Sequence, residues 1–120
     1  MNPLVTIKDI VAASERLKGV ATCTPLQRNK NLSDEFQANI YLKREDLQIV
    51  RSYKIRGAYN FMASRTPEEL KNGIVCASAG NHAQGVAFSC RMMKTHGAIF
   101  MPATTPKQKI SQVKMFGKEF

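Results

Sequence analysis

From residue 40 onward, short apolar runs alternate with segments of helical periodicity, and this alternation restricts the possible folds more than any other feature. The runs at 40–43, 74–78 and 98–101 have the length and composition of strands, and each precedes a segment with apolar residues at helical spacing. Strands and helices that alternate in this way form parallel sheets covered by helices. We therefore expect an α/β fold with a three-stranded parallel sheet and flanking helices, in which 74–78 is a buried strand.

Capping signals predict where several helices begin and end. Thr6 followed by Asp9 predicts the start of a first helix, which Gly19 ends. A hydroxyl cap and a proline at Thr66–Pro67 predict a short helix that ends at residues 72–73. Further helices are expected near residues 32–36, 52–65, 80–93 and 104–117, the last capped by Thr104 and Thr105 with Ile110 and Val113 facing inward.

Length and composition describe one folded domain. The 120 residues are 43% apolar and 22% charged. No run approaches the roughly 18 apolar residues of a membrane span, and the first residues carry no secretory signal. Cys23, Cys76 and Cys90 fit neither a disulfide framework nor a zinc site, and the latter two are expected in the core. These features favour a reducing, cytoplasmic location without a membrane partner.

The net charge of +9, from 18 Lys and Arg against 9 Asp and Glu, is the one unusual figure. Such a charge can attract nucleic acid or another polyanion. The basic residues are scattered along the chain, however, and lack the aromatic alternation and zinc-finger spacing of nucleic-acid-binding modules. We therefore expect no nucleic-acid partner.

A lysine lies at the expected start of the helix in the segment 52–58. The positive end of the helix dipole disfavours a cation there, so an uncharged amine suits Lys54 better than an ammonium group. An uncharged lysine amine attacks carbonyl groups. A solvated surface lysine remains the alternative when Lys54 is considered alone.

Two neighbours of this lysine have structural interpretations. Arg56 is expected to form an ion pair with Glu45 or Asp46. Gly57 and Ala58 are expected to lie at a close helix–helix contact.

The segment 78–85 joins an expected strand to an expected helix and combines small residues with polar ones. Gly80 lets the backbone approach a ligand closely, and N–H groups at a helix start attract anions. The polar side chains carry no fixed negative charge: Ser78, Asn81, His82 and Gln84. This composition suits a carboxylate or phosphate and not a metal ion. An ordinary turn capped by Asn81 is the alternative interpretation.

The two segments together resemble a known family. The run Lys43–Gln48 leading into Ser52–Ala58 resembles the cofactor-lysine motif of fold-type II pyridoxal-phosphate enzymes. Ser78–Gly85 resembles the loop with which the same family binds the substrate carboxylate. The similarity is greatest to the threonine dehydratases (threonine ammonia-lyases), and it continues through Phe100–Pro102 and Thr105–Lys109 to cover nearly the whole chain. It implies a partial fold of the tryptophan-synthase-β type.

The resemblance implies a role for each site residue. Lys54 would hold pyridoxal 5'-phosphate as a Schiff base and, once the substrate displaces it, remove the α-proton. Asn81 would also bind the cofactor, by a hydrogen bond to the cofactor's phenolic oxygen. The substrate carboxylate would be bound, largely through backbone N–H groups, by Ser78, Asn81 and His82. The implied reaction is the deamination and dehydration of L-threonine, and also of L-serine; threonine yields 2-oxobutanoate and ammonia, as in isoleucine biosynthesis.

Two positions depart from related patterns. Tyr53 occupies a position where the family usually has phenylalanine, which leaves its packing role intact. Serine racemase resembles the segment 78–85 but carries an acid–base serine at the position of Ala79. Because a methyl group has no proton to exchange, Ala79 favours elimination over racemisation. The alternatives are a serine-deaminating, racemase-like, cysteine-synthase or threonine-synthase relative of the same fold, or a truncated, non-catalytic basic module.

Residues 1–120 are expected to be the N-terminal part of a pyridoxal-phosphate-dependent catalytic domain. The family's glycine-rich phosphate loop, its group facing the pyridine nitrogen and its C-terminal half are not found in this sequence. A further strand is expected to begin at 118–120. The isolated chain is therefore expected to be inactive and to retain the cofactor poorly, and the full-length family protein to be a homo-oligomer.

Overall fold

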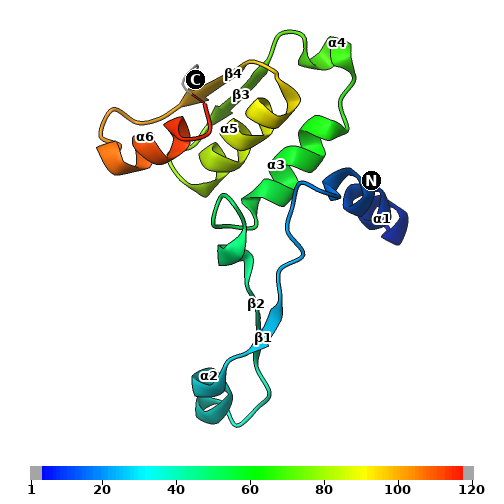
Figure 1. The fold of residues 1–120 in the computed structure, drawn as a ribbon, viewed down its shortest axis with the longest axis vertical. Helices are drawn as coiled ribbons and strands as arrows, with labels where there is room; N and C mark the ends of the chain where they lie inside the picture. The colour runs from blue at the N-terminus through cyan, green and yellow to red at the C-terminus, as the bar shows by residue number, and fades with distance from the viewer. Residues whose placement is uncertain (1–3, 118–120) are drawn as a thin grey trace.

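The computed structural model describes residues 4–117, which form a helical body around a small parallel sheet and a projecting ribbon (Figure 1). In chain order the elements are α1 (Ile7–Leu17), β1 (Leu26–Arg28), α2 (Lys30–Glu35), β2 (Tyr41–Lys43), the 3-10 helix η1 (Glu45–Leu47), α3 (Lys54–Ala63), α4 (Pro67–Leu70), β3 (Ile74–Ala77), α5 (Asn81–Met93), β4 (Gly97–Phe100) and α6 (Lys107–Lys114). The molecule is elongated, with extents of 51 × 39 × 32 Å. Within residues 4–117, each helix is too short or too polar to cross a bilayer.

The parallel sheet confirms the expected α/β architecture but is smaller than expected. Strands β3 and β4 pair in parallel, from Ile74 opposite Gly97 to Ala77 opposite Phe100. Helix α5 connects the two strands and packs against both of them. The interpretation of 74–78 as a fully buried strand is wrong: Val75 is 69% exposed and Phe100 64%. In the described residues only one face of this sheet is covered, so alternate side chains face solvent.

The strand expected at 40–43 does not join the parallel sheet. It is β2, and it pairs with β1 in antiparallel register, from Leu26 opposite Lys43 to Arg28 opposite Tyr41. The expectation of a three-stranded parallel sheet is therefore wrong for residues 4–117, which hold two parallel strands. β1 was not expected because Leu26-Gln27-Arg28 contains one apolar residue and shows no alternation. The further strand expected at 118–120 lies outside the described residues.

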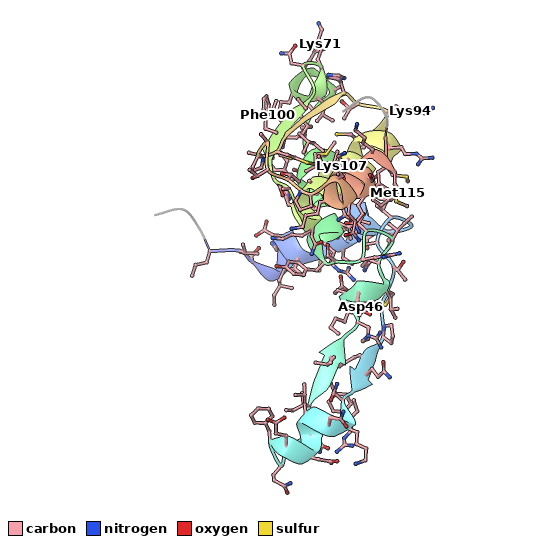
Figure 2. The ribbon with its side chains drawn as sticks, turned by 90° about the vertical axis from the view of Figure 1, so that its left-hand side faces the viewer. Asp46, Lys71, Lys94, Phe100, Lys107 and Met115 are labelled. Carbon is pink, nitrogen blue, oxygen red and sulfur yellow. The ribbon has the colours of Figure 1, made fainter. Side chains whose placement is uncertain are left out.

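The ribbon of β1 and β2, with α2 at its tip, projects from the body as an arm (Figure 1). All six residues of its strands are exposed. Figure 2 shows the same arm from the side, with Asp46 labelled where the ribbon meets the body. We call this junction the neck, and define it as residues 22–24 together with residues 44–52.

The core of the body forms between α3 and α5 and extends to α6. Three clusters of buried side chains make up this core: Ala58, Met62, Val86 and Cys90; Val50, Ile55 and Phe88; and Ala83, Ala87 and Val113. Phe88 and Phe116 meet edge to face, with ring centroids 5.9 Å apart. These contacts confirm that α5 presents an apolar face inward and that Val113 anchors α6.

The three cysteines are free, as expected. Cys90 is fully buried, Cys76 is half-buried and packs on the same cluster, and Cys23 is exposed. Burial raises the pKa of the Cys90 thiol to about 11, and it also raises the pKa of Cys76. Both thiols are therefore protonated near neutral pH and act as small core residues.

Most of the predicted helix ends are confirmed. Thr6 and Asp9 form a capping box at the start of α1, and Thr66 and Glu69 form another at the start of α4. The turn after α4 ends in Gly73, which adopts a φ of +80° and approaches the His96 carbonyl. Such caps depend on short stretches of sequence, so they can be predicted without knowledge of the fold.

The start of α6 differs from its prediction. Pro106 is the N-cap residue, and no side chain caps this helix. The Thr105 hydroxyl, expected to cap, is buried without a hydrogen-bond partner among the described residues.

The close helix–helix contact lies at a different glycine from the one expected. A Cβ atom at Gly57 would meet nothing within 4 Å, so the interpretation of Gly57 as a packing residue is wrong. A Cβ atom at Gly85 would lie 3.1 Å from the Lys54 carbonyl oxygen and 3.3 Å from the Ala58 Cβ. Gly85 of α5 is therefore the residue that lets α3 approach, and Ala58 is its partner as expected.

A pair of glycine substitutions tests this assignment. Gly57→Ala should raise the free energy of unfolding by about 0.5–1 kcal/mol, since alanine is the better helix former and its methyl group meets open space. Gly85→Ala should lower it by about 1 kcal/mol, because the methyl group presses on rigid backbone of α3. Urea denaturation followed by circular dichroism measures both. Equal effects of the two substitutions would contradict the assignment of Gly85.

Candidate active site

Helices α3 and α5 place the two candidate segments side by side. The helices run in the same direction and begin at the same end of the body (Figure 1). Lys54 is the first residue of α3 and Asn81 the first of α5. The approach of Gly85 to the Lys54 carbonyl joins the segments directly through their backbones.

Lys54 is half-buried at the start of its helix, which argues against a fully solvated surface lysine. Its amine lies 5.1 Å from the centroid of the Tyr53 ring. Among residues 4–117, no carboxylate lies within ion-pair distance of this amine. The amine therefore has an aromatic face on one side and no fixed negative charge beside it.

The loop after β3 presents the start of α5 without a side-chain cap. Gly80 is the N-cap residue, so the alternative in which Asn81 caps this helix is wrong. The Ser78 N–H donates to the Phe100 carbonyl at 3.0 Å, and the Ser78 hydroxyl accepts from the Gly80 N–H at 3.3 Å. Ser78 is half-buried, whereas Asn81 and His82 are exposed. The uncapped N–H groups at this helix start are donors that an anion can accept from.

No hydrogen bond within residues 4–117 links the Lys54 amine to Ser78, Asn81 or His82. The structure brings the candidate residues to one end of the body through the packing of their helices. There Asn81 and His82 are exposed, whereas Lys54 and Ser78 are half-buried.

The predicted ion pair of Arg56 is confirmed, with Glu45 as the partner. The guanidinium donates two hydrogen bonds of 2.8 Å to the carboxylate, from Nε to Oε2 and from Nη2 to Oε1. The Thr24 hydroxyl donates to the same carboxylate at 2.6 Å. The hydrogen bonds from Arg56 are the main cause that lowers the pKa of Glu45 to about 2. Asp46 pairs instead with Arg44, at the surface of the neck.

A second set of hydrogen bonds at the neck, made by the Gln48 side chain and called the amide clamp below, was not foreseen from sequence. The Gln48 side chain, only 2% exposed, accepts from the Thr22 N–H at 2.9 Å and donates to the Thr22 carbonyl at 2.8 Å. Its amide also donates to Glu45 at 3.2 Å. Gln48 belongs to the motif run 43–48, but nothing local in the sequence marks Thr22 as its partner. A polar residue flanked by the apolar Leu47 and Ile49 was the only available signal.

The backbone just before Lys54 carries two costly features. Arg51 adopts a φ of +56°, which is unfavourable for a residue with a side chain. The Ser52 hydroxyl is buried without a hydrogen-bond partner among the described residues. Polar atoms left unpaired in this way are uncommon in folded proteins and cluster at functional sites.

One hollow and the search for a metal site point away from these residues. A hollow of about 780 Å³ lies at the far end of α5, lined in part by Arg91, Lys94 and Lys114, and it contains none of the predicted site residues. Within residues 4–117, no three His, Cys, Asp or Glu side chains gather closely enough to hold a metal ion.

Comparison with known proteins defines the class. A family model described as "pyridoxal-phosphate dependent enzyme" matches residues 17–120. The chain therefore belongs to the pyridoxal-phosphate dependent enzymes, and the fold expected from the resemblance is confirmed.

Within this family, the chain is similar to threonine dehydratases. It is 60% identical over 119 residues to the biosynthetic L-threonine dehydratase IlvA of Bacillus subtilis, covering 99% of the chain and 28% of that relative. A solved structure of threonine deaminase isoform 2 from Solanum lycopersicum matches with a TM-score of 0.81 and 45% identity, over 89% of the chain and 30% of the other. Maize serine racemase has a TM-score of 0.89 but 28% identity, over 94% of the chain and 34% of the other. The chain thus spans less than a third of the length of the dehydratases it matches.

The Glu45–Arg56 pair predicts a pH dependence of stability. Because the folded-state pKa of Glu45 lies near 2, below its usual 4.5, the stabilisation is complete above about pH 4.5 and is lost as the pH falls toward 2. Glu45→Gln should lower the free energy of unfolding at pH 7 by about 1–3 kcal/mol, less than the full shift since Arg56 is partly exposed to screening solvent. Denaturant melts from pH 7 to pH 2 should show the difference from wild type shrinking below pH 4.5.

Asp46→Asn is the matched control, because it removes a carboxylate of the same neck that pairs at the surface with Arg44. It should change stability little at any pH. If the difference in free energy of unfolding between wild type and Glu45→Gln is as large at pH 2 as at pH 7, the assignment of the Glu45–Arg56 pair is contradicted.

Proposed function

We propose that residues 1–120 supply one part of the catalytic domain of a threonine dehydratase, in which Lys54 carries pyridoxal 5'-phosphate. One observation carries this proposal: the helix start bearing Lys54 packs, through Gly85, against the helix start that follows the loop after β3. The 60% identity to the Bacillus subtilis dehydratase supports the choice of reaction. Maize serine racemase, which shares the fold, is 28% identical.

The residues present fit the cofactor and an amino-acid substrate. An aldehyde needs an accessible amine without a carboxylate competing for it, and Lys54 meets both conditions among the described residues. A carboxylate needs hydrogen-bond donors and no nearby negative charge, and the loop 78–85 contains no acidic residue. Pyridoxal phosphate, when bound, supplies the electron sink that makes the α-proton of an amino acid removable.

The chain's own residues would then hold the substrate and move one proton. The Ser78 hydroxyl and the backbone N–H groups of Asn81 and His82 would bind the substrate carboxylate and so fix the orientation of the α-carbon, since the Ser78 N–H already donates to Phe100. Asn81 would also donate from its side-chain amide to the phenolic oxygen of the cofactor. The Lys54 amine, at the adjacent helix start, would remove the α-proton, after which the β-hydroxyl leaves. With L-threonine the products are 2-oxobutanoate and ammonia, and L-serine is the second substrate.

The incomplete burial of the chain supports its assignment as part of a larger domain. Apolar residues are exposed on the outer face of the sheet and along one side of α1, where Ile7 is 80% exposed and Ile10 60%. The matching relatives are more than three times as long as the segment that this chain covers. We place the domain in the cytoplasm, as part of a homo-oligomeric enzyme of isoleucine biosynthesis, and expect the isolated chain to be inactive.

A chimera tests the proposed activity. The segment of the Bacillus subtilis dehydratase that matches this chain is replaced by residues 1–120, and the formation of 2-oxobutanoate from L-threonine is measured. The chimera should be active, and Lys54→Arg should lower kcat by about a thousandfold or more, because an arginine keeps the charge but offers no amine. Borohydride reduction followed by peptide mapping should find the pyridoxal-phosphate adduct on Lys54.

Lys71→Arg is the matched control, since Lys71 is exposed at the end of α4, far from the neck (Figure 2). It should leave activity and the adduct unchanged. An active chimera that retains its activity with Arg at position 54, or that carries the adduct on another lysine, would overturn the role of Lys54.

Ala79 predicts which reaction prevails. The chimera should form no measurable D-serine from L-serine, because a methyl group offers no proton to the face opposite the lysine. Ala79→Ser should raise D-serine formation by about tenfold or more relative to the parent, measured by chiral chromatography. Appreciable D-serine from the parent chimera would favour the racemase-like alternative.

A further inference from the structure

We infer that Gln48 and Arg56 are positioning residues for Lys54: from either side of the lysine they tie the backbone that carries it to residues 22–24. This inference rests on the proposed function, because it assigns their role relative to the amine of Lys54. It concerns a network that the similarity to dehydratases does not by itself explain.

Gln48 holds the segment before Lys54. The oxygen and the nitrogen of its buried side-chain amide both form hydrogen bonds with the backbone of Thr22, in the way that paired strand residues do. The Gln48 carbonyl in turn accepts from the Arg51 N–H at 2.7 Å, which closes the turn that leads to Ser52. The turn is therefore fixed to residue 22 through a single buried side chain whose hydrogen bonds are satisfied.

Arg56 holds the helix just after Lys54. It lies two residues further along α3 and reaches the same place, with hydrogen bonds to Glu45 and one of 3.2 Å to the Thr22 carbonyl. Thr22 and Glu45 accept hydrogen bonds from both Gln48 and Arg56. The backbone is therefore held to the same two residues before and after Lys54. The helix start can then neither fray nor rotate without breaking several partly buried hydrogen bonds.

Strain in the turn explains why such a double attachment is needed. The left-handed Arg51 and the unpartnered Ser52 hydroxyl both cost free energy, and both precede Lys54 directly. Such a conformation persists only where surrounding contacts hold it. Val50 and Ile55, both fully buried, fix the apolar side of the same turn, and the polar clamp fixes the other.

The experiment compares Gln48→Leu and Arg56→Lys with the wild-type 120-residue chain. The first removes the amide clamp at similar volume, and the second keeps the charge but loses the two-pronged grip. Arg44→Gln is the matched control, because it removes an ion pair at the surface of the same neck. Circular dichroism establishes that each variant is folded. If either unfolds, Thr24→Ala, which removes one hydrogen bond to Glu45, takes its place.

The first measurement is amide hydrogen exchange, which needs no cofactor. Exchange at residues 55–58 should become about tenfold faster or more in Gln48→Leu and Arg56→Lys, and stay unchanged in Arg44→Gln. Unchanged exchange in both test variants overturns the inference, because the clamp would then not hold the helix start.

The second measurement is the selectivity of pyridoxal phosphate for Lys54 in the chimera with the Bacillus subtilis dehydratase, into which the same substitutions are introduced. After incubation, borohydride reduction and peptide mapping, the ratio of adduct on Lys54 to adduct on Lys71 should fall about tenfold in both test variants and stay constant in Arg44→Gln. A preference for Lys54 that survives in the test variants overturns the inference. A parent chimera without any preference for Lys54 instead counts against the proposed function, while hydrogen exchange still decides the structural part.

Discussion

The close contact between α3 and α5 is the constraint on which the rest of the structure depends. It exists because position 85 has no side chain, so that the Lys54 carbonyl can approach the second turn of α5. Ala58 and Val86, on the same helices, extend the contact into the main core cluster. A parallel pair of helices with a common starting end places two positive dipole ends together. That arrangement disfavours cations and favours anions, which is the electrostatic setting that the roles proposed for Lys54 and for the loop 78–85 both require.

The features that could be foreseen from sequence are those that depend on residues close together in the chain. The capping boxes at Thr6 and Thr66, the start of α3 at Lys54 and the parallel pairing of β3 with β4 follow from short-range patterns and from the alternation of strands and helices. An ion pair of Arg56 with Glu45 or Asp46 was foreseen from the nearby carboxylates, and the structure has Glu45 as the partner. In each case, local chemistry and the final fold agree.

What could not be foreseen depends on contacts between distant segments. Gly57 and Gly85 look alike in sequence, and only the crossing of the helices shows which of them faces a neighbour. The pairing of β2 with β1 instead of the parallel sheet requires knowledge of where the arm leaves the body. The bonds between Gln48 and Thr22 join backbone to side chain across 26 positions, and backbone groups leave no mark in a sequence.

The chain distributes its stability unevenly, and the distribution itself points to the site. Helices α1 and α4 begin with complete capping boxes, whereas α3, α5 and α6 begin without any side-chain cap. An uncapped helix start leaves donors unsatisfied, and a left-handed Arg51 adds strain beside one of them. Elsewhere the same chain uses threonine and asparagine to satisfy such groups, as Asn29 does for α2. Of the three uncapped starts, those of α3 and α5 pack together through Gly85, so they are the pair at which a ligand, rather than the protein, can complete the hydrogen bonding.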